Sequence, residues 1–66
     1  MELYIEKDDI TKNIQIDKET PIKDILNKED IPLETVIIVK NEKICLEDEV
    51  VTNQDKLKVL SVVSGG

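Results

Sequence analysis

The sequence predicts an α+β fold, in which a mixed sheet of about four to five strands carries one short helix across one face. Its hydrophobic fraction of 39% is concentrated in ten Ile, seven Val and six Leu, and β-branched residues favour strands. Period-two alternation occurs near both ends of the chain, and one short segment has helical periodicity. At 66 residues, the chain is expected to form one domain with one small core.

A hairpin is predicted at the start of the chain. Leu3 and Ile5 alternate with less apolar neighbours, as in a half-buried strand, and Asp8-Asp9 then signals a turn. Residues 13–17 alternate in the same way, so a second strand is expected to return antiparallel to the first.

A short helix is predicted to follow this hairpin. Thr20 is the expected N-cap, with Pro21 at the first helical position, where its missing N–H costs nothing. Three apolar residues then fall on one helix face: Ile22, Ile25 and Leu26. Residues 27–30 and Pro32 end the helix after about two turns, so it must pack on a sheet to be stable.

Three further strands are predicted in the second half of the chain. The unbroken β-branched run 35–39 suits a central strand with both faces at least partly covered. Residues 44–46 form a short fourth strand, and 57–63 form a last strand with Leu57 and Val59 inward. The connecting segments are a turn at 41–43, an acidic turn at 47–49, a core-packed loop at 50–51 and a turn at 53–55.

This order of elements favours a mixed sheet with the helix across one face and the last strand beside the first. Such a two-layer roll is the ubiquitin-like β-grasp arrangement. We expect residues 1–63 to form this domain and residues 64–66 to form a C-terminal tail.

The charge balance restricts the partners. Nine Lys and no Arg stand against fifteen Asp and Glu, giving a net charge of −6, which disfavours nucleic acid and anionic membranes and favours a locally basic protein surface. The single Cys excludes an internal disulfide, and no apolar segment has the length of a signal sequence or a membrane span. A cytoplasmic location is expected.

The composition also argues against an enzyme. With no His and one Cys, the usual acid–base and nucleophilic arrangements cannot be assembled, so no catalytic residue is assigned. The acidic residues lie in separated turns without a calcium-loop spacing, so no metal site is predicted. Cys45 lies between Ile44 and Leu46 and is interpreted as strand packing, against the alternative of a sulfur-transfer thiol.

The C-terminus carries the one unusual feature. Gly is absent from residues 1–64 and then occurs twice, as Gly65-Gly66. The two residues are either a frayed end or tag remnant, or a segment without Cβ atoms that threads a narrow channel. We favour the second interpretation, in which Ser64 and Gly65 enter a partner's active site and Gly66 presents its carboxylate there.

A docking surface is predicted beside this tail. If Leu57 and Val59 face the core, the pleat places Leu60 and Val62 on the outer face of the sheet. Exposed apolar residues next to a functional tail indicate partner binding. The alternative is that a loop covers them.

Three segments together resemble one family. The ending Leu60-Ser-Val-Val-Ser-Gly-Gly66, the turn Val39-Lys-Asn-Glu-Lys-Ile44 and the helix start Thr20-Pro-Ile-Lys-Asp-Ile-Leu26 resemble the ThiS/MoaD sulfur carriers. The length is closer to that of ThiS. Two turns depart from the family pattern, with Asn41-Glu42 in place of Asn-Gly and 53–55 reading Asn-Gln-Asp in place of Asp-Gly-Asp.

The resemblance implies a carrier of sulfur. A ubiquitin-activating-type enzyme would use ATP and Mg²⁺ to adenylate Gly66, and a persulfide from a sulfur-donor enzyme, or sulfide, would convert it to a thiocarboxylate. An acceptor synthase would then take the sulfur, for thiamine thiazole, molybdopterin or tRNA thiolation, and the residues do not choose among these. No cofactor is expected on the carrier itself.

Two rival functions remain at this point. A ubiquitin-like protein modifier would use the same activated Gly66 to form isopeptide bonds with lysines of target proteins. A binding-only module of the same fold would have no use for Gly65 and Gly66.

Overall fold

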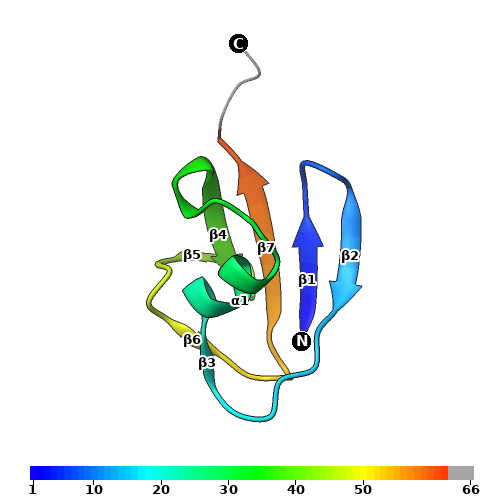
Figure 1. The fold of residues 1–66 in the computed structure, drawn as a ribbon, viewed down its shortest axis with the longest axis vertical. Helices are drawn as coiled ribbons and strands as arrows, with labels where there is room; N and C mark the ends of the chain where they lie inside the picture. Colours follow the sequence, from blue (N-terminus) through cyan, green and yellow to red (C-terminus); the bar gives the residue numbers. More distant parts are fainter. Residues whose placement is uncertain (63–66) are drawn as a thin grey trace.

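The computed structural model describes residues 1–62 and contains a five-stranded sheet in the order β2-β1-β7-β4-β5 (Figure 1). Its strands, in chain order, are β1 (Glu2–Ile5), β2 (Ile10–Asn13), β4 (Val36–Lys40), β5 (Lys43–Cys45) and β7 (Lys56–Ser61). A second, two-stranded ladder pairs β3 (Thr20–Pro21) with β6 (Val50–Val51). The helical elements are α1 (Ile22–Lys28) and the 3-10 turn η1 (Leu33–Thr35).

The last strand lies at the centre of the sheet. β7 pairs parallel with β1 on one side and antiparallel with β4 on the other, which confirms the expected placement beside the first strand. The other ladders are antiparallel, so the sheet is mixed. With α1 across one face (Figure 1), this is the predicted β-grasp arrangement.

The second strand was placed wrongly by the alternation of residues 13–17. β2 covers Ile10–Asn13, because the turn at residues 6–9 brings Ile10 opposite Ile5. Asp9 adopts φ 53° in this turn. Ile14 and Ile16 follow the strand and pack, partly buried, against the core, so their alternation reflects burial in a connecting segment.

The predicted N-cap was also wrong. Pro21 caps α1 and no side chain bonds the helix start, because Thr20 and Pro21 pair with β6. The amides of Ile22 and Lys23 donate instead to the Glu49 carbonyl at 2.8 Å and the Glu47 carbonyl at 3.0 Å. The acidic turn therefore supplies the acceptors that a capping side chain would otherwise provide.

The helix ends in a Schellman motif without glycine. The Ile31 amide donates to the Leu26 carbonyl at 2.8 Å, and the Asp30 amide donates to the Asn27 carbonyl at 3.1 Å. Asp30 takes the left-handed conformation that this motif requires, with φ 61°.

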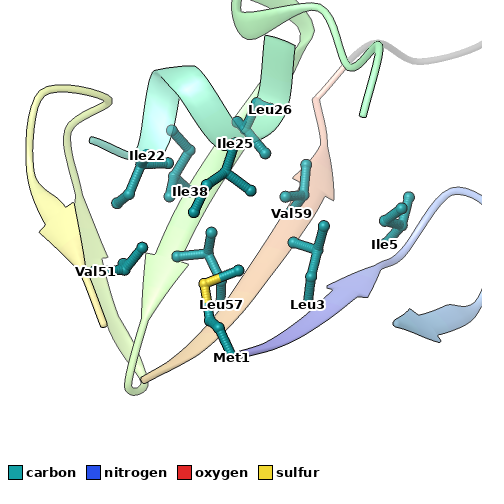
Figure 2. Packing of buried hydrophobic residues seen from close by; sticks show 10 residues of the cluster. All are labelled: Met1, Leu3, Ile5, Ile22, Ile25, Leu26, Ile38, Val51, Leu57 and Val59. Atoms are coloured by element: carbon teal, nitrogen blue, oxygen red, sulfur yellow. The ribbon is translucent and has the colours of Figure 1, made fainter. Parts of the chain in front are cut away.

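One core lies between the helix and the inner face of the sheet (Figure 2). The predicted helix face is buried, and so are Leu57 and Val59 of the central strand. The buried residues are Met1, Leu3, Ile5, Ile22, Ile25, Leu26, Ile38, Val51, Leu57 and Val59.

The outer face of the sheet is partly open at β4. Ile38 is buried and its neighbour Ile37 is 38% exposed, so the inner face of this run is covered and the outer face is partly covered, as expected. Two elements differ from the predicted bounds. Leu46 lies outside β5 and is largely exposed, and Val50–Val51 is a short strand with Val51 fully buried.

The turn between β4 and β5 has a two-residue loop of type I′. Asn41 and Glu42 adopt φ 49° and 70°, the positive values that such a hairpin needs. A residue with a Cβ pays about 1 kcal/mol or more for this conformation. Glu42→Gly should therefore raise the free energy of unfolding by about 1 kcal/mol, measured by urea denaturation.

Asn41→Gly is the matched control for this prediction. It relieves the same strain but removes the Asn41 side chain, which donates to Asp55 at 2.9 Å and accepts the Lys56 amide at 3.0 Å. We expect this variant to be less stable than the wild type. A Glu42→Gly protein that is no more stable than the wild type would contradict the account of the turn.

Candidate partner-binding face and carrier tail

The predicted carrier tail begins at the middle of the sheet. β7 runs between β1 and β4 and ends at Ser61 (Figure 1). The predicted roles of Ser64, Gly65 and Gly66, and the domain boundary after residue 63, lie outside the described residues. They remain predictions from the sequence. What the structure describes is the base of the tail, up to Val62.

Segments on both flanks of β7 are hydrogen-bonded to the base of the tail. The Val62 amide donates to the Thr35 carbonyl at 3.0 Å, and the Ser61 amide donates to Oε1 of Glu6 at 3.2 Å. The chain is therefore hydrogen-bonded on both flanks up to its last described residue.

An apolar face lies beside this point on the outer side of the sheet. Leu60 is opposite Ile37, and Val39 is opposite Ile44. Ile44 is 76% exposed, Val62 is 48% exposed, and Leu60 is half-buried. We call the set Ile37, Val39, Ile44, Leu60 and Val62 the apolar face.

The sequence alone predicted two of these five residues. Leu60 and Val62 followed from the pleat of the last strand, whereas Ile37, Val39 and Ile44 were missed. Their signal was the register of the β4–β5 hairpin, which the two-residue loop at 41–42 fixes. That register puts Ile44 on the same side as Ile37 and Val39, and the pairing of β4 with β7 puts this side next to Leu60.

Charges divide the outer face into two parts. Lys58 is in register with Tyr4 on one side and Val39 on the other. The Tyr4 hydroxyl donates to Oδ1 of Asp9 at 2.8 Å. This bond, followed by partial desolvation and by the charges of Asp9 and Glu6, raises the pKa of Tyr4. Carboxylates of Asp9 and Glu6 thus lie near Tyr4 on the β1–β2 side, Lys58 lies between the two sides, and the β4–β5 side is apolar.

Two comparisons place these features in a family. The ThiS family model matches residues 2–66, nearly the whole chain, including both terminal glycines. The chain belongs to the ThiS family. It is also 31% identical over 55 residues to the sulfur carrier protein TtuB of Thermus thermophilus, covering 83% of this chain and 85% of the relative.

Cys45 does not have the surroundings of a reactive thiol in this family member. It lies opposite Ile38 and packs, partly buried, against the core. Desolvation, and secondarily the charge of Glu49, raises the pKa of its thiol. A raised pKa reduces the thiolate fraction at neutral pH, so the thiol is poorly suited to sulfur transfer.

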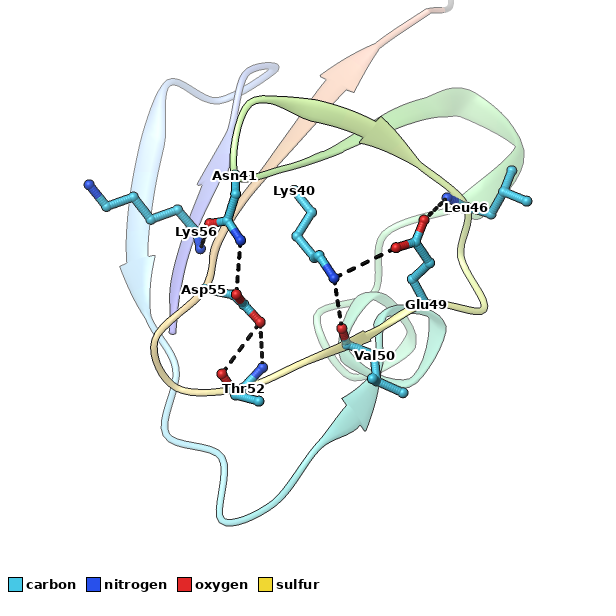
Figure 3. A network of polar contacts seen from close by, with 8 residues as sticks. All are labelled: Lys40, Asn41, Leu46, Glu49, Val50, Thr52, Asp55 and Lys56. Atoms are coloured by element: carbon cyan, nitrogen blue, oxygen red, sulfur yellow. Dashed lines mark hydrogen bonds and ion pairs between the residues drawn. The ribbon is translucent and has the colours of Figure 1, made fainter.

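A polar network ties the β4–β5 hairpin to the turn at 52–55 (Figure 3). Asp55 accepts hydrogen bonds from the Asn41 side chain at 2.9 Å and from the Thr52 amide at 2.8 Å. These bonds, that of Asn41 above all, lower the pKa of Asp55. Lys40 reaches the Val50 carbonyl at 3.2 Å. The cluster holds loops together at the end of the sheet opposite the tail, near the start of β7.

The departure from the family pattern at 53–55 has a structural role. The Asn53 side chain accepts the Ile16 amide at 2.8 Å and donates to the Ile16 carbonyl. It thereby ties the segment after β2 to the turn before β7.

No metal centre or membrane span is found in the described part of the chain. Residues 1–62 contain no group of three or more His, Cys, Asp or Glu side chains able to hold a metal ion. They also contain no helix that is long and apolar enough to cross a membrane.

Proposed function

We propose that this protein is a sulfur carrier whose Gly66 carboxylate is adenylated by a partner enzyme and converted to a thiocarboxylate. The observation that carries the proposal is the family match over residues 2–66, which includes the terminal glycines. The sulfur carrier relative from Thermus thermophilus supports the same assignment. The chain itself acts as a cosubstrate and not as an enzyme.

In this reaction, the chain itself contributes only the acyl group. A carboxylate is a poor electrophile, so it must first be activated. It attacks the α-phosphate of ATP to form an acyl adenylate, and pyrophosphate leaves. A sulfide, or a persulfide from a donor enzyme, then attacks the acyl carbon and AMP leaves. If the nucleophile is a persulfide, a thiol of the partner must next cleave the acyl disulfide to release the thiocarboxylate. ATP and Mg²⁺ are held by the partner enzyme.

The apolar face is the proposed docking surface for the activating enzyme. It adjoins the base of the tail, and two of its members, Ile44 and Val62, are 76% and 48% exposed. Contacts there would bring the enzyme's active site within reach of the tail. The net charge of −6 supports the expectation that the partner's surface is locally basic.

Ile44→Asp should raise the KM for the carrier in adenylation by about 30-fold, because a central apolar contact at an interface is worth about 2 kcal/mol. Ile44 is exposed, so the variant should unfold at the same urea concentration as the wild type. Pyrophosphate release measured at several carrier concentrations gives the KM.

Ile10→Asp is the matched control for this docking prediction. Ile10 is also an exposed isoleucine, at 45%, but it lies on β2 opposite Ile5, away from the apolar face. Its KM should stay within about two-fold of wild type. Equal KM values for Ile44→Asp and wild type would rule out this face as the docking site.

The reconstituted first step tests the proposed function itself. The protein is mixed with the ThiS-activating enzyme of its own source and MgATP, and pyrophosphate release is followed. We expect one pyrophosphate per carrier in the absence of a sulfur donor. No release above that of the enzyme alone would overturn the proposal.

A further inference from the structure

The β1–β2 turn removes one backbone acceptor from the central ladder of the sheet. The parallel pairing of β1 with β7 continues past Ile5, since the Glu6 amide donates to the Val59 carbonyl at 3.0 Å. A regular parallel ladder would next pair the Ser61 amide with the Glu6 carbonyl. That carbonyl instead accepts the Asp9 amide at 3.1 Å, which closes the turn. Ser61 must therefore find another acceptor.

The side chain of Glu6 takes over this role. Its Oε1 accepts the Ser61 amide at 3.2 Å, across 55 residues of sequence. On the opposite flank, the next amide, that of Val62, donates to the Thr35 carbonyl at 3.0 Å. Thr35 is held in turn, because its hydroxyl donates to the Pro32 carbonyl at 3.0 Å. Two successive backbone donors are thus held from opposite sides.

We infer that Glu6 is a positioning residue for the carrier tail, and that together with Thr35 it clamps the point and direction at which the chain leaves the sheet. This inference rests on the proposed function. Residues 63–66 can span at most about 13–14 Å when extended. The position of the tail base therefore limits where the terminal carboxylate can reach, and a displacement of about 1 Å at a reacting group can cost about 100-fold in rate.

A KM-against-kcat comparison tests the clamp in the adenylation assay. Glu6→Ala removes the acceptor, whereas Glu6→Gln keeps an amide oxygen in its place. We expect Glu6→Ala to lower kcat by about 3- to 10-fold, because a lost hydrogen bond only partly frees the tail base. Its KM should stay within about two-fold, because the apolar face is unchanged. Glu6→Gln should recover at least half of the lost kcat.

Glu2→Ala is the matched control, since Glu2 is an exposed glutamate at the start of β1, whereas Glu6 directly follows that strand. It should leave kcat unchanged. A second measurement does not depend on catalysis: amide hydrogen exchange at Ser61 should become faster in Glu6→Ala and remain near wild type in Glu6→Gln and Glu2→Ala.

The outcomes separate the clamp from the carrier function. If wild type is adenylated and Glu6→Ala matches its kcat, or changes only its KM, the positioning role is wrong and the carrier function stands. If all three variants lose kcat equally, the effect is one of charge and the clamp is again wrong. If wild type releases no pyrophosphate, the proposed function fails and the inference fails with it.

Discussion

Removing Gly65 and Gly66 should lower the rate of adenylation by at least about 100-fold, because a reacting group displaced by even about 1 Å can lose that much. The deletion shortens the reach of the tail by about 7 Å. The core, the sheet and the apolar face all lie within residues 1–62, so the shortened protein should fold normally. Pyrophosphate release with the activating enzyme is the measurement.

The shortened protein should still bind the activating enzyme. Because docking is assigned to the apolar face, it should inhibit adenylation of the wild type competitively, with an inhibition constant within a few-fold of the wild-type KM. Adenylation of the shortened protein at the normal rate would contradict the role of Gly66. Loss of both adenylation and inhibition would place the docking surface on the tail.

Leu57→Ala should remove a large part of the free energy of unfolding. Leu57 is 1% exposed and lies on the central strand, in register with Leu3 of β1. A buried Leu→Ala change costs about 2–5 kcal/mol. A domain of this size has a total stability of roughly 3–10 kcal/mol, so the change removes much of it. Urea denaturation followed by far-UV circular dichroism gives the free energy of unfolding.

Val62→Ala is the control for this stability prediction. Val62 is 48% exposed and lies outside the core, so its truncation should cost less than about 1 kcal/mol. If Leu57→Ala unfolds at the same urea concentration as Val62→Ala, the assignment of the core to this face of β7 is wrong.

Alternation predicted the parts of the fold where one face meets the core. Leu3 and Ile5 in β1, and Leu57 and Val59 in β7, lie inward as expected. The same rule failed at residues 13–17, because Ile14 and Ile16 are partly buried in a connecting segment, which Asn53 ties to a distant turn. An apolar pattern indicates which residues are buried, but it does not by itself show which residues pair in a β-ladder.

The prediction of the helix start failed for a different physical reason. Thr20 and Pro21 have the residue types of an N-cap and a first helical position. In the folded chain their backbone pairs with β6, and carbonyls of residues 47 and 49 accept the first helical amides. A tertiary contact across more than twenty residues replaced the local cap, and no local sequence rule contains it.

The candidate site was predictable only along a single strand. Leu60 and Val62 follow from the pleat of β7, but Ile37 and Ile44 join them only through strand pairing. The bond between Glu6 and Ser61 joins residues far apart in sequence. It depends on which carbonyl the β1–β2 turn consumes, which the three-dimensional structure alone reveals.

Intact mass spectrometry of the protein from its native cells tests most directly whether Gly66 carries sulfur. Replacement of one carboxylate oxygen by sulfur adds about 16 Da at the C-terminus, and a Gly66-deleted version expressed in the same cells should lack this species. We predict that the sulfur-bearing form is present in the full-length protein alone. A full-length protein found only with a free carboxylate, or only in isopeptide linkage to other proteins, would contradict the sulfur-carrier function.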